Sequence, residues 1–157
     1  MSHHSGSQHP GHHRFPRARI DPITDPGTAL MLLRRMQAIP RRHETLIVLL
    51  DDAHRGFSIV TIDNTPRPDQ AIDAVECFAR PEIVRKNGLS ALIIASDRTP
   101  DGSPDPADTD RWFEMCEIAE RVGVELVEWF LFCREVSCPR DLVGAPPRWR
   151  GPAARSA

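Results

Sequence analysis

The sequence has no long apolar run and no paired cysteines. No stretch of its 157 residues approaches the ~20 consecutive apolar residues of a membrane-spanning helix. Residues 1–15 also have no apolar core of the kind that a signal peptide needs. The four cysteines show no CxxC spacing, and three of them lie in apolar runs, where a reduced thiol packs as a small hydrophobic group. We therefore expect a cytoplasmic protein with reduced thiols and no membrane partner.

Lysine is nearly absent, and charge is unevenly distributed. Lys86 is the only lysine among 20 basic residues, as codon bias in a GC-rich genome produces. Residues 1–43 contain seven arginines against two acidic residues, whereas residues 44–138 contain nineteen acidic residues against nine basic ones. An acidic surface repels a phosphate backbone. We therefore expect no nucleic-acid partner for the folded core, and only the basic ends could provide one.

The chain has room for one hydrophobic core, and hence for one domain. Residues 148–157 combine arginine with turn residues and have no periodicity. Residues 1–20 are rich in polar residues and proline, and they include five of the seven histidines, namely His3, His4, His9, His12 and His13. Such segments cannot offset the entropy of ordering themselves. We expect both tails to be disordered and a single domain to occupy residues 21–147.

Apolar periodicity predicts an α/β fold with the element order α-β-β-α-β-α-β. The expected elements are a helix from 26 to Pro40, strands 45–50 and 57–62, a helix 69–80, a strand 91–95, a helix 105–121 and a strand 124–132. The ALIIA run at 91–95 is apolar on successive residues, as in a strand covered on both faces. It is therefore the expected central strand. A further turn after Pro81 and a short strand after Cys133 complete the expectation.

The loop before the helix 105–121 is polar and interrupted by proline. Asp105 is a natural N-cap, with Pro106 at the first helical position and Asp108 at N3, a near match to a capping box. We interpret Arg98 as an internal ion-pair partner of the nearby acids. The alternative is a divalent-cation site made by Asp101, Asp105, Asp108 and Asp110. Their spacing fits no EF-hand loop.

The buried strand, polar loop and acidic helix start together resemble the RadC-like branch of the JAB/MPN family. In that family a strand ends in His-x-His, which is followed after seven residues by Ser-x-x-Asp. The resemblance extends over residues 45–143: a leucine-rich strand ends at Asp51, and GVELVEWFLF is similar to the family's Gly-(Ile/Val)-Glu-Leu-Leu-Asp-His strand. It implies a JAB/MPN-like, cytidine-deaminase-like mixed sheet flanked by helices.

The family's metal-binding histidines are replaced in this sequence. In the family two neutral imidazoles and a carboxylate bind zinc and leave the fourth position for an activated water. Ser96 and Arg98 occupy the two histidine positions. A hydroxyl is a weak zinc ligand, and a guanidinium repels the ion.

The Ser-x-x-Asp element is altered as well. Without a gap it falls on Pro106 and Thr109; with a one-residue insertion it falls on Ala107 and Asp110. We prefer the insertion because it keeps an acid in the first turn of the helix. Glu44 is the nearest match to the family's general base. The resemblance thus implies a degenerate site with no catalytic residue, no metal and no other cofactor.

Two functions follow from the resemblance. The first is a catalytically silent bacterial JAB/MPN-like domain that acts through protein–protein contacts with a partner that the sequence does not identify. The alternative is a diverged metal-dependent hydrolase of the same family, which would use zinc. Both functions are compatible with a homo-oligomer.

Overall fold

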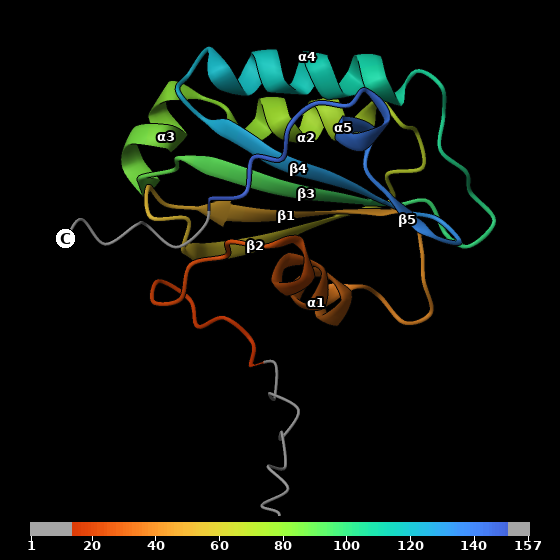
Figure 1. Ribbon diagram of the computed structural model, residues 1–157, viewed down its shortest axis with the longest axis horizontal. Coiled ribbons are helices and arrows are strands. Elements are labelled where there is room, and N and C mark those ends of the chain that lie inside the picture. Colours follow the sequence, from red (N-terminus) through yellow and green to blue (C-terminus); the bar gives the residue numbers. More distant parts are fainter. Residues whose placement is uncertain (1–13, 151–157) are drawn as a thin grey trace, which may run out of the picture.

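A computed structural model describes residues 14–150, so the expectations for residues 1–13 and 151–157 lie outside the described residues. One mixed sheet has the strand order β2-β1-β3-β4-β5, with helices packed on both faces (Figure 1). β3 and β4 pair in parallel, and the other neighbours are antiparallel. The strands are β1 (Glu44–Leu50), β2 (Gly56–Asp63), β3 (Ala91–Asp97), β4 (Glu125–Phe132) and β5 (Val136–Ser137). The α/β class and the central position of β3 are confirmed.

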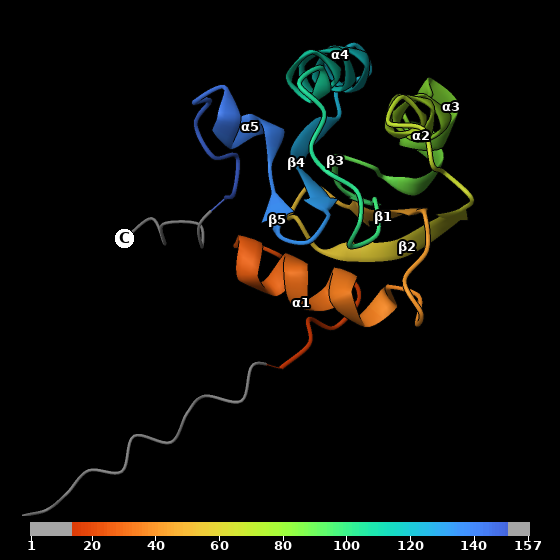
Figure 2. The ribbon, with the colours of Figure 1, turned by 90° about the vertical axis from the view of Figure 1, so that its right-hand side faces the viewer.

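One helix covers one face of the sheet, and the others lie on the opposite side (Figure 2). The helices are α1 (Pro26–Met36), α2 (Gln70–Phe78), α3 (Pro81–Asn87), α4 (Asp108–Glu120) and α5 (Pro139–Leu142). The expected order is therefore present. The short strand expected after Cys133 is β5, and α3 and α5 are added to the expected elements. α3 is separate from α2 because Pro81 starts a new helix and Gly88, at φ 64°, ends it. No helix within residues 14–150 is long and apolar enough to cross a membrane.

The core consists of two apolar layers, one on each face of the sheet. Alternate side chains of β1 point to opposite faces of the sheet, and a core covers each face. All seven residues of β1 are therefore buried. On one face Ala29 and Leu33 of α1 pack on the sheet. On the other face Trp112 of α4 and Trp129 of β4 pack with α2, and both indoles are at most 1% exposed. The expected core position of both tryptophans is confirmed.

The packed part of the chain extends past residues 21 and 147 at both ends. The Arg19 amide donates to the carbonyl of Gly56 at 2.8 Å. At the other end, the Trp149 ring lies 6.3 Å from the ring of Phe130. Composition suggested tails here because arginine and proline dominate, but an indole and the stems of arginines bury readily against apolar neighbours. Residues 14–20 and 148–150 therefore belong to the described fold.

Candidate functional site

β3 ends in polar residues that point to opposite faces of the sheet. Ser96 pairs with Thr45 of β1, and Asp97 pairs with Glu44. The Trp129 indole Nε1 donates to Ser96 Oγ at 2.9 Å. The guanidinium of Arg98 lies 5.8 Å from the centre of the same indole. Ser96 and Arg98 therefore share the face that α4 covers, as alternate residues along a strand do.

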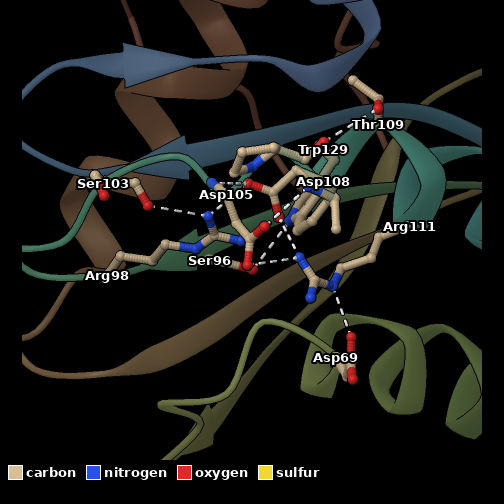
Figure 3. A network of polar contacts seen from close by, with 11 residues as sticks. Asp69, Ser96, Arg98, Ser103, Asp105, Asp108, Thr109, Arg111 and Trp129 are labelled. Atoms are coloured by element: carbon tan, nitrogen blue, oxygen red, sulfur yellow. Dashed lines mark hydrogen bonds and ion pairs between the residues drawn. The ribbon is translucent and has the colours of Figure 1, made fainter.

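Arg98 makes a two-pronged ion pair with Asp108 at the start of α4 (Figure 3). The two nitrogen–oxygen distances are 2.6 Å and 2.7 Å. Asp108 is fully buried, and Arg98 is 8% exposed. Arg98 also donates to the carbonyl of Ser103 at 3.3 Å. The predicted internal ion pair of Arg98 is confirmed, and its partner is Asp108.

The remaining acceptor positions of Asp108 are also used. The Asp105 amide donates to Asp108 Oδ2 at 2.7 Å, and the Ala107 amide donates to Asp105 Oδ1 at 2.9 Å. The first is the return bond of the predicted capping box. The Asp105 side chain accepts from the N2 amide instead of the N3 amide, which bonds the Asp105 carbonyl, and the regular α-helix begins only at Asp108. Arg111 donates to Asp108 Oδ1 at 3.0 Å and to Asp69 of the β2–α2 loop at 2.6 Å. Each oxygen of Asp108 therefore accepts two hydrogen bonds, which is the capacity of a carboxylate.

Asp110 does not join this network. It is exposed, because two helical residues rotate the side chain by about 200° from the direction of Asp108. Ala107 lies in the turn before α4 and contributes its amide alone. Sequence reasoning used Asp108 as a helix cap and as one of the acids near Arg98, but it placed Asp110 at the position of the family's metal-binding carboxylate. Helical spacing contained the missing signal, since Asp108 precedes buried Trp112 by four residues and Met115 by seven.

A second polar cluster lies at the same strand end, on the face that α1 covers. Buried Asp97 accepts from Arg41 at 2.9 Å and from the side-chain amide of Gln37. Arg41 also donates to two carbonyls at the end of β4, at 2.9 Å and 3.1 Å. Glu44 lies beside Asp97 and accepts from the Ala38 amide at 2.7 Å. Glu44 is therefore on the opposite face from Ser96 and Arg98, where it cannot act as their general base.

A pocket of about 450 Å³ opens beside Arg98. Its other lining residues are His43, Gly102, Ser103, Asp105 and four prolines, Pro66, Pro68, Pro104 and Pro106. The loop fits closely around Arg98, because a Cβ atom at Gly102 would lie 2.2 Å from the Arg98 carbonyl oxygen. The pocket therefore lies against a closely packed loop, and the charge of the Arg98 guanidinium beside it is balanced by Asp108.

A third buried ion pair joins β4 to the C-terminal segment. Arg140 of α5 donates to Glu128 at 2.8 Å and to the carbonyl of Ala145 at 2.7 Å. Burial raises the pKa of Glu128, and the hydrogen bond from Arg140 opposes that rise. Sequence reasoning treated β4 as an apolar strand and did not find this pair. Glu128, the acid among the apolar residues at the centre of GVELVEWFLF, was the available signal.

The residues at the end of β3 do not fit a zinc ion. The Ser96 hydroxyl accepts an indole N–H, the Arg98 guanidinium is a fixed cation, and both oxygens of Asp108 are committed to hydrogen bonds. Within residues 14–150, no three His, Cys, Asp or Glu side chains are arranged to hold a metal. A scan against protein-family models finds no match for this chain, and a search of curated proteins also finds none.

Proposed function

We propose that this chain is a JAB/MPN-like domain that has no hydrolytic activity and acts through protein–protein contacts in the cytoplasm. The buried Arg98–Asp108 ion pair is the observation that supports it. In the family that the sequence resembles, a metal ion ties the end of one strand to the start of the following helix. Here the guanidinium of Arg98 supplies the positive charge at that place, and Asp108 supplies the carboxylate. Two protein side chains thus connect the end of β3 to the start of α4.

Within residues 14–150, the hydrogen-bond partners of Ser96 and Arg98 include no free general base of the kind that hydrolysis needs. A general base must lie within hydrogen-bonding reach of the proton that it removes. Glu44 lies on the far side of the sheet, and Asp108 is enclosed by donors. Ser96 accepts a hydrogen bond from Trp129, and in the described part of the chain it makes no hydrogen bond with a histidine. These features favour a structural role for the former metal site.

Restoring the metal site tests the family assignment. The double substitution Ser96→His and Arg98→His would place two imidazoles on one face with Asp108 opposite, which makes three zinc ligands with an open fourth position. The five histidines among residues 1–13 are replaced by serine in every variant, because they bind zinc independently. Calorimetry is expected to show one zinc ion per chain in the double variant and none in its parent. Residues that would orient the two imidazoles through hydrogen bonds have not been selected, so a zinc affinity about 10–100-fold below that of a native site is expected.

Two further variants locate the third ligand. Adding Asp108→Asn to the double variant should abolish zinc binding, whereas adding Asp110→Asn should leave it unchanged, because only Asp108 faces the site. A double variant that binds no zinc would show that the family assignment is wrong. Dependence on Asp110 instead would show that our choice of ligand is wrong.

Contact with a partner is tested separately from the metal site. A photo-reactive residue at exposed Ser103, which lines the pocket beside Arg98, is expected to cross-link to a discrete protein in native cells. In the control, the same photo-reactive amino acid replaces Glu117, which is exposed on α4. Identical cross-linking patterns from both sites would count against the pocket as a contact surface.

A further inference from the structure

Residues 14–43 form one layer of the molecule, on the side of the sheet that α1 covers. Figure 2 shows residues 14–20 and α1 on that side, and α2 and α4 on the other. Residues 16–18 line a pocket together with Leu32 of α1, so the N-terminal segment packs on this helix. The loop that follows α1 lies on the same side, because its Arg41 pairs with Asp97. We call residues 14–43 the α1 layer.

The α1 layer is basic, whereas α2 and α4 on the opposite side are acidic. The α1 layer contains seven arginines against Asp21 and Asp25. Two of these arginines, Arg41 and Arg42, pair with acids of the sheet, so five arginines remain against two aspartates. On the opposite side, Arg111 is the one basic residue of α2 and α4, and the exposed acids of these helices are Asp73, Glu76, Asp110, Glu114, Glu117 and Glu120. The domain therefore has a positive side and a negative side.

Exposed apolar side chains are interspersed with the arginines of the α1 layer. Of the six large apolar side chains that are exposed among residues 14–150, four lie in this layer, namely Phe15, Ile20, Met36 and Ile39. The first three directly follow an arginine in the sequence, and Ile39 is 98% exposed. Apolar side chains beside basic ones are typical of protein surfaces that lie on a membrane, because the apolar groups enter the boundary of the acyl chains while the cations contact lipid phosphates.

We propose that the α1 layer binds the surface of a membrane that contains anionic lipids. Anionic head groups attract the positive side of the domain and repel the negative side, so charge also sets the orientation of the domain. The apolar side chains distinguish this partner from a nucleic acid, because a phosphate backbone offers no apolar phase for Ile39. Such a contact requires neither a membrane-spanning helix nor a signal peptide, and the expectation of no membrane partner was based on the absence of those two features.

Vesicle sedimentation with the full-length chain tests the lipid class. One set of vesicles contains phosphatidylglycerol and phosphatidylcholine in equal parts, and the other contains phosphatidylcholine alone. The measurement is made at about pH 7.5, where histidines with an ordinary pKa of about 6.5 are neutral. We expect binding to the anionic vesicles only, with release as salt rises from about 0.1 M to about 1 M, because the Debye length falls from about 10 Å to about 3 Å. A chain that binds neither set of vesicles, or both equally, would overturn the proposal.

Matched substitutions locate the contact on the α1 layer. Arg35→Gln should lower the partition coefficient for anionic vesicles about fivefold, because it removes one exposed positive charge from the surface. Arg85→Gln, on exposed α3 across the sheet, is its control and should have little effect.

A second pair of substitutions tests the apolar part of the contact. Ile39→Ser should lower the same partition coefficient about tenfold, because Ile39 then has no apolar group to bury. Phe113→Ser, at an exposed position of α4, is its control and should leave binding unchanged. Equal losses from Arg35→Gln and Arg85→Gln would refute the proposal. An unchanged partition coefficient for Ile39→Ser would refute it as well, since charge alone would then be recognised, as by a nucleic acid or an acidic protein.

Discussion

Substitutions of Arg98 and Asp108 measure how much their ion pair contributes to the free energy of unfolding. Charge-assisted hydrogen bonds contribute about 1.5–3 kcal/mol each, and breaking one side of a buried pair costs about 3–5 kcal/mol. Arg98→Met leaves Asp108 with bonds from the Asp105 amide and Arg111, so we expect a loss of about 3 kcal/mol in the free energy of unfolding. Asp108→Asn strands a guanidinium that is 8% exposed, so a loss of about 3–4 kcal/mol is expected.

Replacing both partners distinguishes an ion pair from simple packing. Arg98→Met with Asp108→Leu removes both charges, so its loss should be about 1–2 kcal/mol, mostly from the capping bond to Asp105. Urea unfolding, followed by both tryptophan fluorescence and far-UV circular dichroism, measures all three variants. Single substitutions that each cost less than about 1 kcal/mol would refute the reasoning. A double variant as unstable as the two singles added together would refute it as well.

Three more outcomes follow from burial. Trp129→Ala should cost about 3–5 kcal/mol by urea unfolding, because the side chain is fully buried, and Trp129→Phe should cost less. Burial lowers the pKa of His54 below its ordinary 6.5, so the unfolded chain binds more protons there. Stability should be complete above pH 6.5 and fall as pH decreases through the folded-state pKa, and His54→Asn should flatten that profile. Native-state titration with a thiol reagent should modify Cys77 rapidly but not Cys116 or Cys138, because burial raises the pKa values of those two thiols to about 11 and 12; equal rates would contradict the packing.

Local sequence patterns predicted the strands and helices well where the residues of one segment alone determine its secondary structure. The ALIIA run and the two β-branched strands became β3, β1 and β2 within a few residues of their expected limits. Pro81 was expected to separate a helix from a further turn. It does so, and the segment that it starts is the helix α3, because proline suits the first helical turn. α5 has four residues and was not predicted, since so short a segment has no measurable periodicity. The specific JAB/MPN topology remains part of the proposal.

The candidate site was predictable only in part, because its contacts join elements that are distant in the sequence. The capping bond between Asp105 and Asp108 and the ion pair of Arg98 lie within one loop and were predicted from it. The choice between Asp108 and Asp110 depended on the phase of α4, which the neighbouring Trp112 indicates. The pairing of Asp97 with Arg41, 56 residues away, depends on how α1 is placed on the sheet, and no local pattern specifies that.

The position of β1 between two partners has a consequence for the growing chain. Glu44 pairs with Asp63 across the hairpin and with Asp97 across the other side of β1. During synthesis the hairpin can form as soon as β2 emerges, but the second side of β1 stays unpaired until β3 follows. Until then an apolar strand is exposed to association with other chains. Once the sheet is complete, the β1 amides should be among the last to exchange with deuterium, because they open only when the whole domain unfolds.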